Sequence, residues 1–108
     1  MVTIQIRIGD AVAKLRARAR RATGSLKARL QTLIDALIEL VEALAAATVG
    51  PHTEPDLKRL LDEVAALLDA IEASAETDLT EAVEATLATA ETSLEAILVK
   101  LGRRPGPN

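Results

Sequence analysis

Hydrophobic and polar residues alternate strictly at the start of the chain. The apolar positions are Val2, Ile4, Ile6 and Ile8, and the polar positions between them are Thr3, Gln5 and Arg7. Alternation of β-branched residues is typical of a half-buried strand, so the pattern predicts a strand over residues 2–8. No later segment alternates in this way, and a lone strand leaves its backbone groups unpaired. The sequence therefore predicts a homodimer, in which the same strand of a second copy pairs with it and Ile4, Ile6 and Ile8 lie in the shared core.

After Gly9, the spacing of apolar residues changes to that of a helix. The apolar positions of residues 10–22 fall on one arc at about 100° per residue, and Asp10 is a suitable N-cap. They are Ala11, Val12, Leu15, Ala19 and Ala22, whereas Lys14, Arg16, Arg18, Arg20 and Arg21 occupy the rest of the helix. This basic surface is a solvated face, a face that pairs with acidic helices, or a contact for a polyanion.

A Thr-Gly-Ser break at residues 23–25 predicts the end of one helix and the start of the next. Leucines then recur at alternating steps of four and three over a helix predicted at residues 26–47, with a second apolar seam beside them. Two adjacent seams indicate a helix buried from two sides, as in a bundle or a dimer core. The predicted core positions of this helix are Leu30, Leu33, Leu37 and Leu40.

The chain is expected to have two parts joined by a linker. Residues 1–48 form the first part, residues 49–55 are a linker rich in proline and glycine, and residues 56–102 form the second part. Helices are predicted at about 54–74 and 79–101, with Thr53–Asp56 and Asp78–Glu81 as capping pairs and Gly102 as the end. Residues 103–108 are expected to be a flexible tail. The predicted fold is mainly α: a short N-terminal strand followed by four helices, of which the later ones form an antiparallel bundle.

Charge is divided unequally between these parts. Residues 1–30 carry eight basic residues and one acidic residue, for a net charge of +7, whereas residues 31–102 have a net charge of −12. The whole chain, at −3, conceals this division. Such an asymmetry suggests a segment that faces a polyanion joined to an acidic region.

The composition removes several classes of chemistry. The sequence has no cysteine and no Phe, Tyr or Trp, so disulfides and thiolate sites are excluded and the core is made of aliphatic residues. The single histidine, His52, could hold a metal with Glu54 and Asp56, but an exposed loop histidine is the simpler interpretation. Neither a phosphate loop nor a catalytic constellation is present, so we predict no enzyme activity, no metal and no cofactor. Without an apolar run of about 18 residues or a signal peptide, a cytoplasmic protein without a membrane contact is expected.

The order of elements over residues 2–45 resembles the ribbon-helix-helix family of small repressors and antitoxins. The resemblance rests on Thr3–Ile8, on the first helix with Val12, Leu15 and Ala19, and on Gly24-Ser25 before the leucine-rich helix. In that family, paired strands enter the DNA major groove. The resemblance implies base contacts from Thr3, Gln5 and Arg7, because Gln suits adenine and Arg suits guanine. It also implies phosphate contacts from the start of the second helix and the basic helix, that is from Gly24, Ser25, Lys14, Arg18, Arg20 and Arg21.

Two functions follow from these observations. The first is a sequence-specific DNA-binding homodimer, of the repressor, antitoxin or plasmid accessory type, whose residues 53–102 mediate oligomerisation or bind a protein partner. The alternative is a non-catalytic helical bundle, natural or designed, that has a structural or protein-interaction role without nucleic acid. In the alternative, the basic helix packs beside the acidic ones, and the charge difference is balanced within the molecule.

Overall fold

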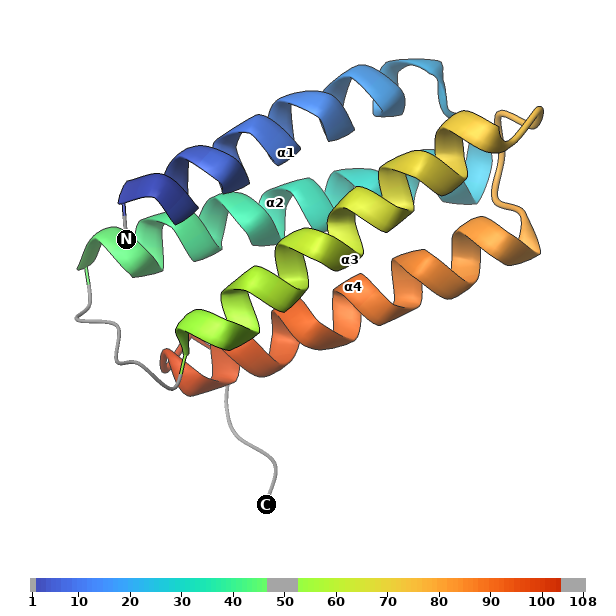
Figure 1. Ribbon diagram of the computed structural model, residues 1–108. Coiled ribbons are helices and arrows are strands. Elements are labelled where there is room, and N and C mark those ends of the chain that lie inside the picture. The colour runs from blue at the N-terminus through green and yellow to red at the C-terminus, as the bar shows by residue number, and fades with distance from the viewer. Residues whose placement is uncertain (1, 47–52, 104–108) are drawn as a thin grey trace.

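The segment predicted to be a strand is helical in the computed structural model, which describes residues 2–46 and 53–103 (Figure 1). Helix α1, Val2–Arg21, runs without interruption through Gly9 and Asp10. The prediction of a strand over residues 2–8 is therefore wrong. The physical reason is that a helix satisfies the backbone groups of this segment internally, whereas a strand needs a second strand beside it.

The burial of the first isoleucines follows the helical period and not the alternating one. Ile4 and Ile8, four residues apart, are 6% and 0% exposed, whereas Ile6 between them is 60% exposed. Ile8 and Ile4 extend the apolar arc of Ala11 and Leu15 toward the N-terminus by one and two turns, respectively. The predicted core position of Ile6 is wrong because residues two apart lie about 200° apart on a helix.

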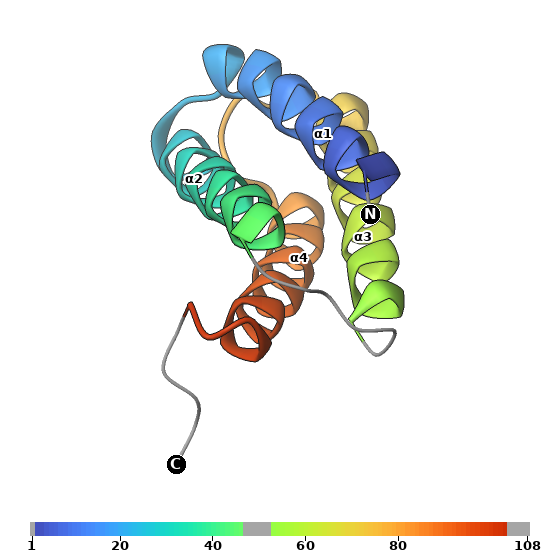
Figure 2. The same cartoon turned by 90° about the vertical axis from the view of Figure 1, so that its left-hand side faces the viewer.

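Four helices form two antiparallel hairpins that lie side by side. Helix α2 is Gly24–Ala46, helix α3 is Glu54–Ala73 and helix α4 is Glu81–Lys100. Within each hairpin the helices pack closely, and between hairpins α1 packs on α3 and α2 packs on α4. Figure 2 shows the resulting order around the bundle, with α1 across from α4 and α2 across from α3. Between the hairpins, α1 runs parallel to α3, and α2 runs parallel to α4 (Figure 1).

The core is built from aliphatic side chains alone. Every buried residue in the described part of the chain is Ile, Leu, Val or Ala, and no polar or charged residue there is buried. The predicted core positions of α2 are confirmed as buried: Leu30, Leu33, Leu37 and Leu40 are all at most 1% exposed. They are covered by helices of the same chain. A second copy was expected because it would complete a lone strand, and a helical N-terminus has no need of one.

Two of the predicted helix caps differ from those in the structure. Thr53 makes no side-chain cap, and Asp56 instead accepts hydrogen bonds from Arg59 and Lys100. Thr80, rather than Asp78, caps α4 by accepting a hydrogen bond from the Val83 amide at 3.3 Å. The predicted end of α4 is confirmed, because Gly102 has a φ of +77° and the next amide bonds back to Leu98. Most of the predicted linker, with His52, and residues 104–108 of the predicted tail lie outside the described residues.

Candidate functional site

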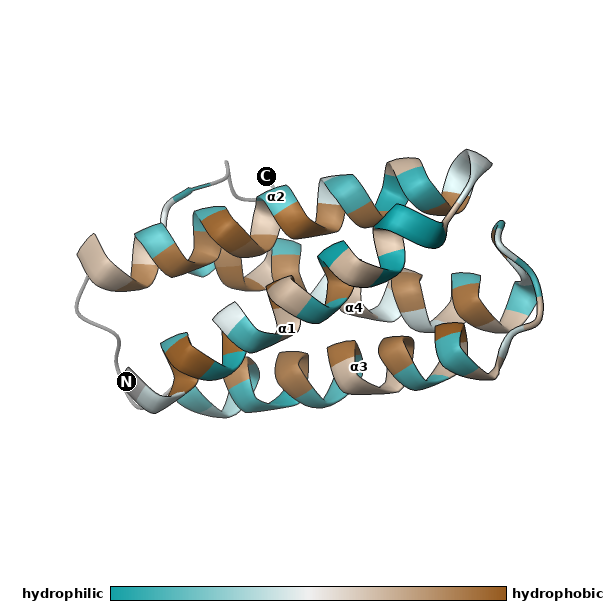
Figure 3. Ribbon diagram, turned by 90° about the horizontal axis from the view of Figure 1, so that it is seen from above, coloured by the Kyte–Doolittle hydropathy of each residue, from teal (hydrophilic) through white to brown (hydrophobic). Residues whose placement is uncertain are grey.

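Exposed cations gather on α1 and on the first two turns of α2. Within the described part of the chain, six of the eight basic residues in this region have no carboxylate within ion-pair distance. They are Arg7, Lys14, Arg16, Arg20, Arg21 and Lys27, and the side chains of all six are exposed. We call these six residues the cationic face. Figure 3 shows the hydrophilic colour concentrated over the C-terminal half of α1.

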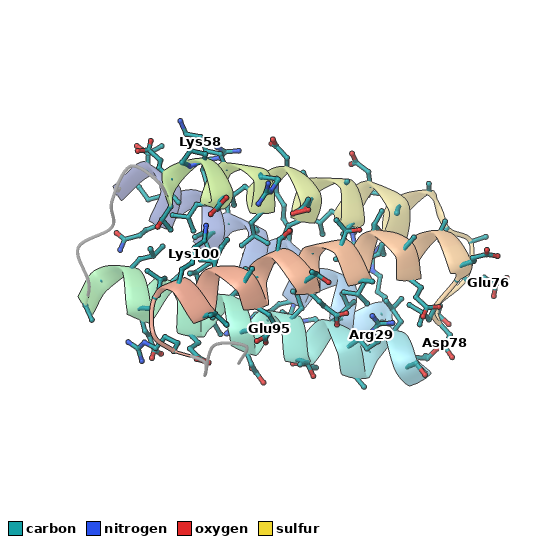
Figure 4. All side chains as sticks on the ribbon, turned by 90° about the horizontal axis from the view of Figure 1, so that it is seen from below. Arg29, Lys58, Glu76, Asp78, Glu95 and Lys100 are labelled. Carbon is teal, nitrogen blue, oxygen red and sulfur yellow. The ribbon has the colours of Figure 1, made fainter. Side chains whose placement is uncertain are left out.

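The other two cations of this region join the two hairpins. Arg18 in α1 pairs with Glu72 in α3 at 2.5 Å. Arg29 in α2 pairs with Glu91 in α4 at 2.6 Å and lies 3.7 Å from Glu84 (Figure 4 labels Arg29). The hydrogen bond from Arg29 to Glu91 raises the pKa of its guanidinium above the usual value, against a smaller opposing effect of burial. The charge difference between the hairpins is thus balanced internally at two points.

The lysine and arginine residues of α3 and α4 form ion pairs within their own hairpin. Lys58 pairs with Glu54 at 3.4 Å, Arg59 pairs with Asp56 at 3.1 Å, and Lys100 also pairs with Asp56. The hydrogen bond from Lys100, together with the charge of Arg59, lowers the pKa of the Asp56 carboxyl. All the lysine and arginine residues of these two helices are therefore in ion pairs, whereas most of those on α1 are not.

Two rows of cations run along α1. Arg7, Lys14 and Arg21 recur every seven residues, so they form one row about 21 Å long at 1.5 Å per residue. The row lies on the side of α3: Arg7 and Lys14 border a hollow with Leu61 and Leu68, and Arg21 borders a second hollow with Ile71.

The second row, Arg16 and Arg20, lies on the other flank of the exposed half of the helix, at about 100° per residue. Between the two rows lie the exposed, uncharged residues Ile6, Ala13 and Ala17, and toward the N-terminus also the exposed acid Asp10. From Ala13 to Arg21, the cationic face therefore has a low apolar centre and charged edges.

The residues predicted to read bases do not share one surface. In a helix, Thr3 and Arg7 lie four residues apart on the same side, whereas Gln5 lies on the opposite side and its side chain is half-buried. The family resemblance placed them side by side because successive odd residues of a strand point the same way. Since the strand is absent, this base-reading surface is not formed, and among the three Arg7 alone belongs to the cationic face.

The amides predicted to hold a phosphate are already engaged. Asp78, in the turn before α4, accepts a hydrogen bond from the Leu26 amide at 3.2 Å and another from the Leu79 amide at 2.7 Å. Hydrogen bonds from the Leu79, Leu26 and Ser25 amides lower the pKa of its carboxyl. A carboxylate of the same chain thus occupies the anion position at Gly24 and Ser25. The sequence analysis did not predict this contact, because Leu26 and Asp78 are 52 positions apart in the chain.

Other kinds of site find little support in the described residues. No group of three or more His, Cys, Asp or Glu side chains there could hold a metal ion. His52, the histidine considered for such a role, lies outside the described residues. Among the described helices, none combines the length and the apolar character that a membrane span requires.

Comparisons of the chain with profiles of known protein families, with curated proteins and with solved structures found no match. The candidate site therefore rests on geometry and charge alone. The cationic face is the feature of this molecule that most needs an explanation, because six like charges repel one another and none of them is in an ion pair within the described residues.

Proposed function

We propose that the protein is a non-catalytic helical binding module that uses its cationic face to bind the phosphate backbone of a nucleic acid. The observation that carries this proposal is the difference between the two hairpins. The cations of α3 and α4 are in ion pairs, whereas Arg7, Lys14, Arg16, Arg20, Arg21 and Lys27 are exposed and have no ion-pair partner in residues 2–46 and 53–103. Arginine and lysine that neutralise phosphates release counterions, and this release drives non-specific nucleic-acid binding.

Nucleic acid remains the proposed partner, but it is not bound through a two-stranded ribbon. Base reading by a two-stranded ribbon of Thr3, Gln5 and Arg7 is not proposed, because residues 2–8 belong to α1. A phosphate contact at Gly24 and Ser25 is not proposed either, because the Asp78 carboxylate already binds there. Lys14, Arg20 and Arg21 remain proposed phosphate contacts. Arg18 does not, because its guanidinium is paired with Glu72.

A salt titration of binding to a duplex of random sequence tests the proposal. If all six cations contact phosphates, log K should fall with log of salt concentration with a slope of about −5. Replacing Lys14 and Arg20 by Gln should reduce the slope by about 2 units, one for each phosphate that is no longer neutralised. The matched control replaces Lys58 and Arg59 by Gln. It removes the same charge from α3 and should leave the slope unchanged. No binding at low salt would contradict the proposal.

A second candidate function is suggested by α4. Its outward side presents the exposed small residues Ala85, Ala88, Thr89, Thr92 and Ala96, beside the exposed acids Glu81, Glu84 and Glu95. A helix surface of small side chains allows another helix to approach closely. We therefore also consider a protein-interaction role for this surface. Sedimentation of the wild type and of Ala88→Arg would test for self-association through it, because an arginine there should weaken such packing.

A further inference from the structure

The exposed half of α1 has the shape and charge of a helix that enters a groove, and we infer that its ligand is a B-form DNA duplex bound through the major groove. This inference rests on the proposed function and specifies the partner. The charged rows lie on the two flanks of α1, and the centre between them carries Ala13 and Ala17, with Ile6 and Asp10 toward the N-terminus. A flat polyanion-binding surface would not need this division into centre and flanks.

The dimensions of the helix agree with those of the groove. An α-helix with its side chains is about 10–12 Å across, and the major groove of B-DNA is about 12 Å wide. Small central residues allow the backbone of α1 to approach the base edges. Lys14 and Arg21 on one flank, and Arg16 and Arg20 on the other, each face one edge of the groove. The centre offers methyl groups, which contact the C5-methyl of thymine rather than hydrogen-bond to a base.

The same features disfavour other nucleic acids. The major groove of an A-form RNA duplex is too deep and narrow for a helix. Proteins that bind single strands without sequence preference stack the bases on aromatic side chains, and this sequence contains no aromatic residue. A B-form duplex is therefore the ligand that the geometry favours.

Three acidic groups define how far the contact extends. Asp10 is the one acidic residue of α1 and is exposed on the same half of the helix as the cations. Glu72 and Glu76 border the same hollow as Arg21 at the C-terminal end of α1, and Glu72 is paired with Arg18. The C-terminal half of α1, from Ala13 to Arg21, is therefore the part that inserts, because it is free of acids and carries four of the five exposed cations of the helix.

Competition binding at low salt tests the inference. The probes are a DNA duplex, an RNA duplex of the same sequence, and a DNA duplex whose cytosines carry glucosylated 5-hydroxymethyl groups, which fill the major groove. We expect the unmodified DNA to bind about tenfold more tightly than either of the others, because α1 could not reach the base edges of those two duplexes. Netropsin, which occupies the minor groove, should not displace the protein.

The outcomes separate this inference from the proposed function. Equal affinity for all three duplexes, with a steep salt dependence, would overturn the major-groove inference and leave phosphate binding intact. Tighter binding to RNA, or displacement by netropsin, would also overturn it. Absence of binding to every duplex at low salt would overturn both. A variant with Asp10→Asn serves as a check on the inserting half: its affinity for the unmodified duplex should rise, while its preference over the glucosylated duplex stays the same.

Discussion

The carboxylate of Asp78, in the turn between α3 and α4, accepts a hydrogen bond from the main-chain amide of Leu26 at the start of α2 (Figure 4 labels Asp78). The second hairpin thereby supplies an N-cap to a helix of the first hairpin. At the same end of the bundle, Thr23 donates its amide to the Thr77 carbonyl at 2.9 Å, and the hydroxyls of these two threonines lie 3.0 Å apart. The two turns are therefore connected by main-chain and side-chain hydrogen bonds.

This connection makes Gly24 sensitive to substitution. Gly24 has a φ of +58°, and a Cβ atom placed there would lie 2.4 Å from Asp78 Oδ2. Gly24→Ala should therefore lower the free energy of unfolding by at least about 1–2 kcal/mol from backbone conformation alone. Thermal or urea unfolding measures this change.

Gly9 provides the matched comparison for that substitution. It lies inside α1, and a Cβ atom there would have no neighbour within 4 Å. Gly9→Ala should raise the free energy of unfolding by about 0.5–1 kcal/mol, because alanine costs less conformational entropy in a helix. A destabilising effect of Gly9→Ala would contradict a continuous α1.

Burial at the N-terminus distinguishes the helix from the strand most directly. Ile8 is fully buried, so Ile8→Ala should destabilise the fold by about 2–5 kcal/mol. Ile6 is 60% exposed, so Ile6→Ala should change stability by no more than about 0.5 kcal/mol. A strand would place both side chains on the same face, and equal destabilisation by the two substitutions would support it. Chemical denaturation of the two variants gives the comparison.

Acid should weaken the connection between the turns. Hydrogen bonds from three backbone amides lower the pKa of Asp78 in the folded protein. The unfolded chain then binds more protons in the interval between the folded and unfolded pKa values. The stabilising contribution of Asp78 is present above its unfolded pKa, about 3.9, and is lost as the pH falls through the lower folded value. Unfolding measured from pH 6 to about pH 2 should show a smaller acid-induced decrease in stability in Asp78→Asn than in the wild type.

The ion pair between Arg29 and Glu91 should contribute modestly to holding the hairpins together. Both side chains are about one-third exposed, and the guanidinium donates to the carboxylate at 2.6 Å. A double-mutant cycle with Arg29→Met and Glu91→Gln should give a coupling energy of about 0.5–1 kcal/mol, which decreases with added salt. The neighbouring residue Lys27 has no such partner among the described residues, and Lys27→Met should show no coupling to Glu91.

Much of the fold could be predicted from local pattern. The breaks between segments and the predicted caps located α2, α3 and α4 to within two residues at each end, and the leucine spacing of α2 identified Leu30, Leu33, Leu37 and Leu40 as core. The first eight residues could not be assigned in the same way, because Ile4 and Ile8 fit both a strand of period two and a helix of period 3.6. The signal for the helix was the continuation of that spacing into Ala11, Leu15 and Ala19.

The sequence by itself determined an aliphatic, all-helical core after residue 9 and a positive first segment, since both depend on residue type and on spacing along one helix. The tertiary structure decided which cations are neutralised. Arg18 and Arg29 meet Glu72 and Glu91, whereas Lys14 and Arg20 meet no acid in the described residues. It also decided that the start of α2 binds Asp78 instead of an external anion. These outcomes depend on how two hairpins pack, and contacts between residues more than fifty positions apart leave no periodic pattern in the sequence.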